Sequence, residues 1–290
     1  MSIQQQESRL QVGASDQIYV KEKWRDDRER GPAMLMVHGY NGLGALGNYD
    51  LPVKDFSGMD FFAERGYHVF ALDLRGFGQS SHPDPICWED NVTDVKEVLS
   101  FISAKRGGAR VNLLGGSYGG AITFTAASRY PDLVDHLILL CTPYRTARPE
   151  GRAMLNMLLQ MADQKKLAYL SVPVSDRPDQ ATISVDPDVV KWRIEVSQKS
   201  DMRVPIQPCR EMLEFTAADA VRTVRAPTLV VVGEKDFIVS VEDSLALLND
   251  LGTPEKALIV IGNAGHGLMY ETSQRHIWGL IAQGLPSATP

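Results

Sequence analysis

Ser117 stands in the middle of the stretch Gly-Gly-Ser-Tyr-Gly, residues 115–119. Apolar residues precede this stretch at 111–114, and a helical pattern follows it at 118–130. The glycines permit a sharp strand-to-helix turn that lifts a serine hydroxyl clear of a sheet, above a helix N-terminus that favours negative charge. The pattern therefore predicts a nucleophile and leaves the backbone N–H of Tyr118 for an oxyanion. A glycine-rich turn with a capping serine is the structural alternative.

A serine hydroxyl becomes a strong nucleophile only beside a general base, which is most often a histidine. His266 lies in a glycine-flanked loop, 262–270, directly after the last apolar run of the chain. A base on such a loop can reach the carboxyl edge of a sheet, so we expect His266 to be the base. The other histidines fall in strands, a helix or loops that favour structural roles: His38, His68, His82, His136 and His276.

An acid is needed to hold the imidazole of the base in the right tautomer. Asp236 closes the run "PTLVVVGEKD" at 227–236, just past the end of a predicted strand. Other carboxylates lie close by in the sequence, namely Glu234, Glu242 and Asp243. Asp236 is the expected acid, and a turn or helix cap is its structural alternative.

Short apolar runs separate the helix-length segments of this chain. Near-continuous apolar runs are typical of strands buried on both faces, and their alternation with helices indicates an α/β fold with a parallel sheet. Residues 9–24 alternate around a turn, which predicts an edge hairpin, and residues 1–8 are expected to be frayed. The predicted strands are 33–39, 67–73, 110–116, 136–142, 227–236 and 256–262, and the predicted helices are 55–65, 89–105, 118–130, 241–251 and 272–284.

The interval 145–224 breaks this alternation, because it contains no buried-strand pattern. We interpret it as a helical insertion between two strands of the sheet. The expected organisation is therefore a core of 1–144 and 225–290 with an insertion at 145–224. Within it, helical spacing is found at 150–170, 186–200 and 208–220.

Four motifs give the chain a resemblance to the α/β-hydrolase superfamily, over roughly 9–144 and 225–285. The nucleophile position holds a serine, whereas epoxide hydrolases and haloalkane dehalogenases of that fold use an aspartate there. The order Ser117, Asp236, His266 matches the order of the family's catalytic triad. The motifs are "HGYNG" at 38–42, "LDLRGFGQSS" at 72–81, "GEKD" at 233–236 and "GHGLMYE" at 265–271.

The resemblance implies a role for each matching residue. Ser117 would attack a carbonyl carbon, His266 would take and return its proton, and Asp236 would hold the imidazole. The backbone N–H groups of Tyr40 and Tyr118 would form the oxyanion hole.

The insertion falls where that family carries its lid, between the sixth and seventh strands. Met154, Leu158 and Met161 stand at helical spacing within it and are the expected substrate contacts. Flexible thioethers suit an adaptable apolar pocket. Packing inside the lid is the structural alternative for these side chains.

Composition limits the partners of this 290-residue chain. Its formal net charge of −6 argues against nucleic acid or an anionic membrane as the main partner. No apolar run approaches the roughly 18 residues of a membrane span, and the start has no secretory signal. The three distant cysteines have neither metal spacing nor a disulfide pattern. We expect a cytoplasmic protein without metal or cofactor, whose oligomeric state the sequence leaves open.

These observations favour a serine hydrolase that cleaves an ester or thioester of a small to medium, largely apolar acyl compound, including a carrier-bound thioester. The same triad would also serve an acyltransferase or a hydrolase of carbon–carbon bonds. An aminopeptidase is a further alternative, and it would need acidic lid residues to hold the amine. A ligand receptor on the same fold is the non-enzymatic alternative.

Overall fold

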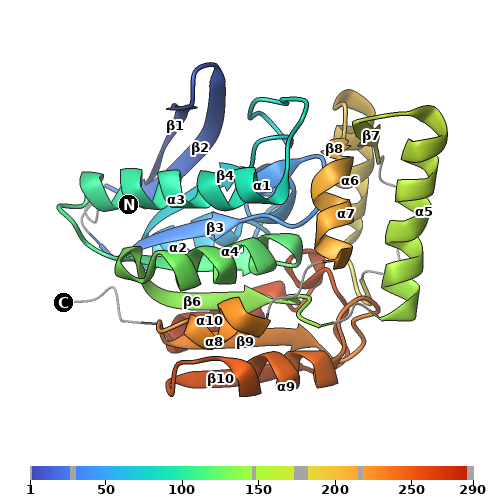
Figure 1. The fold of residues 1–290 in the computed structure, drawn as a ribbon. Helices are drawn as coiled ribbons and strands as arrows, with labels where there is room; N and C mark the ends of the chain where they lie inside the picture. The colour runs from blue at the N-terminus through green and yellow to red at the C-terminus, as the bar shows by residue number, and fades with distance from the viewer. Residues whose placement is uncertain (1, 27–30, 146–147, 173–181, 215–217, 286–290) are drawn as a thin grey trace.

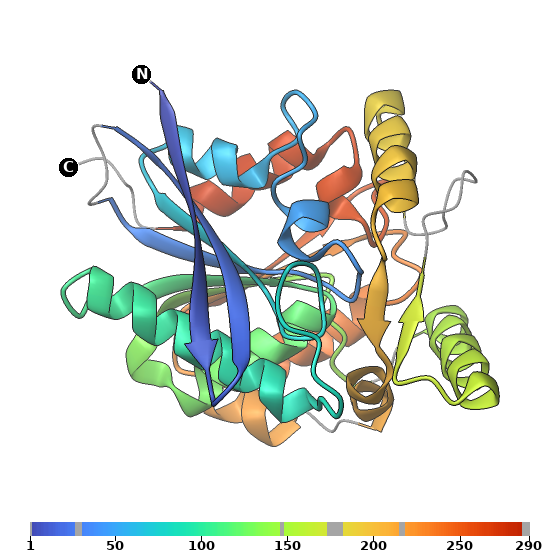
Figure 2. The same ribbon diagram turned by 90° about the horizontal axis from the view of Figure 1, so that it is seen from above.

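The sheet of this protein lies between two layers of helices (Figures 1 and 2). The computed structural model describes residues 2–26, 31–145, 148–172, 182–214 and 218–285. Within these residues, eight strands form one sheet in the order β1-β2-β4-β3-β5-β6-β9-β10. The strands are β1 (Ile3–Val12), β2 (Asp16–Arg25), β3 (Ala33–Val37), β4 (His68–Asp73), β5 (Val111–Gly116), β6 (Val134–Leu140), β9 (Thr228–Gly233) and β10 (Lys256–Ile261).

Neighbouring strands pair in parallel along the series β4-β3-β5-β6-β9-β10. β2 pairs antiparallel with both β1 and β4. The mostly parallel α/β fold predicted from the apolar runs is therefore confirmed. The expectation of a frayed start is wrong for residues 3–8, which form the first six of the ten residues of β1. Pairing with β2 supplies the backbone hydrogen bonds of this strand, so its exposed polar side chains do not prevent strand formation.

Helices cover both faces of the sheet. Each face has its own hydrophobic core, which explains why the strands β3, β4 and β5 are buried along their whole length. One face packs against α3 (Trp88–Lys105), α4 (Tyr118–Arg129), α8 (Ala218–Thr223) and α9 (Val241–Asp250), and the other against α1 (Gly44–Asn48), α2 (Gly58–Glu64) and α10 (Gln274–Gln283).

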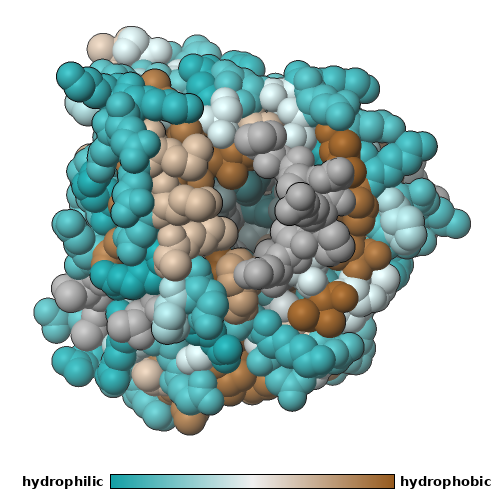
Figure 3. All heavy atoms as spheres, turned by 90° about the vertical axis from the view of Figure 1, so that its right-hand side faces the viewer, coloured by the Kyte–Doolittle hydropathy of each residue, from teal (hydrophilic) through white to brown (hydrophobic). Residues whose placement is uncertain are grey.

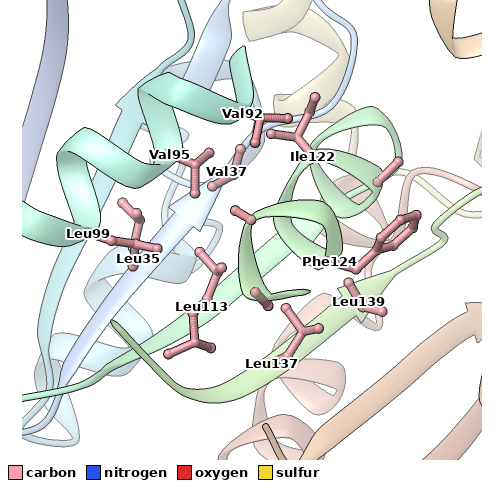
Figure 4. Close-up of a cluster of buried hydrophobic side chains, with 14 of the residues drawn as sticks. Leu35, Val37, Val92, Val95, Leu99, Leu113, Ile122, Phe124, Leu137 and Leu139 are labelled. Carbon is pink, nitrogen blue, oxygen red and sulfur yellow. The ribbon is translucent and has the colours of Figure 1, made fainter. Parts of the chain in front are cut away.

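Figure 4 shows the centre of the first core, where aliphatic side chains of β3, β5 and β6 meet those of α3 and α4. Leu113 of β5, Val95 of α3 and Ile122 of α4 are fully buried there. This packing fixes the strand before Ser117 and the helix after it. The turn that carries the serine is therefore held at both ends.

The chain between β6 and β9 forms α5 (Pro149–Lys165), β7 (Tyr169–Ser171), α6 (Pro187–Lys199), β8 (Arg203–Pro205), α7 (Ile206–Glu214) and then α8. β7 and β8 pair antiparallel, and they were not predicted because strands of three residues carry no readable periodicity. Residues 215–217 of the predicted helix 208–220 lie outside the described residues. In Figures 1 and 2, α5, α6, α7 and the small sheet stand together beyond the end of the main sheet toward which β6 points.

α8, at the end of the predicted insertion, packs into the first core. Val221 and Val224 belong to the first core, together with residues of α4 and α9. The boundaries 145–224 of a lid domain stay a prediction. None of the described helices is both long and apolar enough to cross a membrane.

Candidate active site

Ser117 lies on the turn between β5 and α4, with φ 52° and ψ −119°. This left-handed conformation is uncommon for a residue with a side chain and is concentrated at functional sites. The turn has no room for a side chain at Gly119, where an added Cβ would collide with the backbone oxygens of Val37 and His38. The glycine-rich sequence is therefore explained by the close approach of α4 to the end of β3.

His266 lies between Ser117 and Asp236. Its Nε2 is 2.9 Å from Oγ of Ser117, and its Nδ1 is 2.8 Å from Oδ2 of Asp236. These residues follow β5, β9 and β10, which run in parallel and present their carboxyl ends at one edge of the sheet. The structure thus brings together the three side chains that the sequence singled out.

Asp236 is fully buried and makes three hydrogen bonds. Its Oδ1 accepts from the N–H groups of Ile238 and Val239, at 2.8 and 2.9 Å. Burial alone would raise the pKa of this carboxyl, but the nearby His266 and the two N–H groups hold its pKa below the ordinary value. Because an ionised carboxylate can only accept, Nδ1 of His266 carries the proton and Nε2 is the acceptor that faces Ser117. This arrangement can remove the hydroxyl proton.

Two backbone N–H groups lie where an oxyanion hole is expected. Tyr118 is the first residue of α4, so its N–H has no partner within the helix. Tyr40 follows β3 in a loop beside the nucleophile, since an added Cβ on Gly39 would lie 3.4 Å from Cβ of Ser117. Neither N–H donates to another residue of the described chain. Both are thus available to a negatively charged oxygen.

His38 is buried beneath this loop, and neither of its ring nitrogens is bonded to Ser117. Its Nε2 accepts from the N–H of Leu74 at 3.0 Å, so its Nδ1 is protonated and donates to the carbonyl of Gly39 at 2.7 Å. Burial lowers the pKa of His38 to about 4. A neutral histidine with both nitrogens bonded orients the loop and is unsuited to be the base.

A cavity of about 600 Å³ adjoins Ser117 and His266, within the usual size range of ligand pockets. The face of the molecule that carries α5 and α6 is hollowed in Figure 3. Met154 and Leu158 line the cavity as expected, together with further apolar side chains. The expectation for Met161 is not supported: it is not among the lining residues and is 38% exposed. Met161 lies about 10 Å beyond Met154 along α5, past Leu158, the last residue of this helix in the described cavity lining.

Few charged groups line the described part of the cavity. They are one acid, Glu150, and three arginines, Arg145, Arg152 and Arg193. Arg145 donates to Asp250 at 2.6 Å. The guanidinium of Arg193 lies 4.4 Å from the centre of a tyrosine ring, a cation–π distance. Positive groups therefore outnumber negative ones around the space in which a substrate would lie.

One group of described side chains could offer three ligand atoms to a metal ion, within 4.8 Å of one another: Cys141, Asp236 and His266. The aspartate and the histidine are bonded to each other. Burial, reinforced by the charge of Asp236, raises the pKa of the Cys141 thiol well above its ordinary value. Since metals bind the thiolate, the cluster suits proton transfer better than metal binding.

The sequence patterns missed two residues that hold the site. Glu271 is buried, and its Oε1 accepts from the N–H of Gly265 at 2.8 Å, next to His266. Its signal was the last letter of the motif "GHGLMYE". Asn48 is buried at the end of α1 and contacts two loops of the site. No local pattern marks it, because its partners lie far away in the sequence.

Comparison with known proteins agrees with this fold. The Hydrolase_4 family, described as serine aminopeptidase, S33, matches residues 32–273. A proline iminopeptidase, PfmaB of Pestalotiopsis fici, is 25% identical over 84% of this chain and 88% of its own length. Lipase 1 of Psychrobacter immobilis is 27% identical over 83% of this chain and 73% of its own. A soluble variant of monoglyceride lipase from Saccharomyces cerevisiae has a similar fold, with a TM-score of 0.75, 17% identity, and coverage of 98% of this chain and 95% of that one.

Proposed function

We propose that this protein cleaves an ester or thioester of a small to medium, largely apolar acyl group. The premise is that the chain belongs to the Hydrolase_4 family and is an enzyme of the α/β-hydrolase type. One observation carries the proposal. Ser117, His266 and Asp236 are hydrogen-bonded in series beside a cavity whose lining is mostly apolar.

The proposed reaction proceeds through an acyl-enzyme. Oγ of Ser117 attacks the carbonyl carbon while Nε2 of His266 takes the hydroxyl proton. The N–H groups of Tyr40 and Tyr118 stabilise the oxyanion. His266 then gives the proton to the departing alkoxide or thiolate, and a water activated by the same nitrogen releases the acid. Asp236 stabilises the imidazolium in both halves of the reaction.

Charge in the cavity argues against an aminopeptidase, the activity in the family's description. A peptidase that removes an N-terminal residue must hold a protonated amine, which requires uncompensated carboxylates. Glu150 is the acid among the described lining residues, and it shares the cavity with Arg145, Arg152 and Arg193. An uncharged acyl group fits these surroundings better than a cation.

Three finer points belong to the same proposal. Residues 145–224 act as a lid, since α5 supplies Met154 and Leu158 to the cavity wall. A carrier-bound thioester is one form of the substrate. The enzyme works in the cytoplasm, in keeping with cysteines that are free rather than disulfide-bonded, Cys87, Cys141 and Cys209.

A fluorophosphonate probe followed by a substrate screen tests the proposal. We expect labelling of the wild type, loss of labelling in Ser117→Ala, and full labelling in Ser15→Ala, an exposed serine in the turn between β1 and β2. The screen then measures hydrolysis of p-nitrophenyl esters and acyl thioesters of graded chain length. Labelling without any hydrolysis would favour acyl transfer or carbon–carbon cleavage. A protein that is not labelled but binds a ligand tightly would be a receptor.

A further inference from the structure

The side chain of Asn48 joins the two loops that flank Ser117. Its Oδ1 accepts from the N–H of Gly39 at 2.7 Å and from Nδ2 of Asn41 at 3.0 Å. Its Nδ2 donates to the hydroxyl of Tyr270 at 2.6 Å. The first two partners belong to the loop of Tyr40, and the third belongs to the segment that follows His266.

The orientation of the Asn48 amide follows from the chemistry of its partners. A backbone N–H can only donate, so the amide oxygen must face Gly39. The NH₂ group must then face Tyr270, whose hydroxyl oxygen accepts. Asn48 is 5% exposed, so few water molecules can replace a partner that is lost. An aliphatic side chain would leave the N–H of Gly39 unpaired.

The contact at Gly39 matters because Tyr40 is the next residue. The peptide plane that ends in the N–H of Tyr40 begins at the carbonyl of Gly39. This carbonyl accepts from Nδ1 of His38 and from both the N–H and Nδ2 of Asn41. Asn48 therefore holds the N–H of Gly39 while the other two hold its carbonyl. With both sides held, the direction of the Tyr40 N–H is defined.

We infer that Asn48 is a positioning residue for the oxyanion hole. Its side chain aligns the N–H of Tyr40, and its bond to Tyr270 couples the loop of Tyr40 to the loop of His266. The inference rests on the proposed function. An oxyanion donor acts only when it is held in place before the charge develops, and a displacement of about 1 Å can cost roughly 100-fold in rate. Asn48 does not itself contact the reacting atoms.

Steady-state kinetics of Asn48→Ala on the best ester of the screen tests this role. We expect kcat to fall about 10- to 100-fold while KM stays within about threefold, because the oxyanion is stabilised in the transition state and not in the ground state. Affinity for a trifluoromethyl ketone, which forms an oxyanion on the enzyme, should fall in parallel with kcat. The matched control is Asn249→Ala, an exposed residue of α9 outside the cavity lining. An unchanged kcat, or a rise in KM alone, would overturn the positioning role.

The link to the histidine loop is tested by Tyr270→Phe, alone and combined with Asn48→Ala. The single change should lower kcat by about two- to tenfold, and it should add little when Asn48 is already replaced, because coupled residues are not additive. Fully multiplicative effects would refute the link. If Asn48→Ala does not fold, Tyr270→Phe decides by itself, since an unchanged kcat refutes the coupling. A wild type without any turnover refutes the proposed function, whereas a wild type with turnover and an Asn48→Ala variant with an unchanged kcat refute this inference alone.

Discussion

Replacing Asp236 by asparagine should stop catalysis without changing the shape of the site. Oδ1 of Asp236 takes the N–H groups of Ile238 and Val239, and Oδ2 takes Nδ1–H of His266. Asparagine has a single acceptor oxygen. If its NH₂ group faced the two buried N–H groups, each would be left unpaired at a cost of about 1–3 kcal/mol.

The amide oxygen must therefore remain with the two backbone N–H groups, and the NH₂ group must face Nδ1 of His266. Nδ1 then has to accept, so the imidazole proton moves to Nε2. A protonated Nε2 points at Oγ of Ser117 and cannot take its proton. A histidine held in the wrong tautomer lowers kcat by about 10⁴-fold, which corresponds to roughly 5 kcal/mol of transition-state stabilisation.

The assay compares kcat and kcat/KM of wild type and Asp236→Asn on one ester at neutral pH. Circular dichroism and thermal unfolding establish that the variant is folded. Asp132→Asn, an exposed aspartate, controls for the loss of a charge. A folded Asp236→Asn enzyme that loses less than about tenfold in kcat would show that Asp236 does not set the tautomer of His266.

Three further changes have defined outcomes. Tyr40→Phe removes the hydroxyl that donates to the carbonyl of Pro205 at 2.5 Å. Urea unfolding should show a free energy of unfolding lower by about 1–3 kcal/mol, with kcat nearly retained. An unchanged free energy of unfolding would contradict this. Leu158→Trp fills part of the cavity, so turnover of long-chain esters should fall more than turnover of acetyl esters, and an equal loss for all chain lengths would contradict the assignment. The pKa of His38 is about 4 in the folded state and roughly 6.5 in the unfolded state. As the pH drops, the unfolded state therefore takes up the proton before the folded state does, and the free energy of unfolding falls between these two pKa values. Between pH 7 and 5, wild type should lose about 2 kcal/mol more than His38→Gln in urea titrations, and parallel losses would refute the buried neutral histidine.

Much of this protein can be predicted from short stretches of its sequence. The strand before Ser117 was predicted because strands buried on both faces are nearly continuous apolar runs, and β5 is buried throughout. The tight turn was predicted because the glycines that it requires are written into the motif. Loop positions after β9 and β10 singled out Asp236 and His266, since the carboxyl ends of parallel strands share one edge.

Other features of the site depend on partners that no local pattern can name. Asn48 and Tyr270 lie 222 residues apart and meet through one hydrogen bond. Met154 and Met161 are the same residue type at helical spacing, yet Met154 lines the cavity and Met161 does not, which only the packing around the cavity decides. The strands β7 and β8 exist because they pair with each other, not because three residues prefer to be extended.

The sequence by itself thus determined the α/β fold, the tight turn and the three side chains of the candidate site, because each is encoded by apolar runs, glycines or loop residues within about ten positions. Only the tertiary structure decided that Ser117 and His266, 149 residues apart, lie within hydrogen-bonding distance, and which side chains enclose the space beside them. Hydrogen bonds and packing act over a few ångströms in space regardless of separation along the chain. The distances that set the chemistry are therefore defined only when the sheet and its helices have come together.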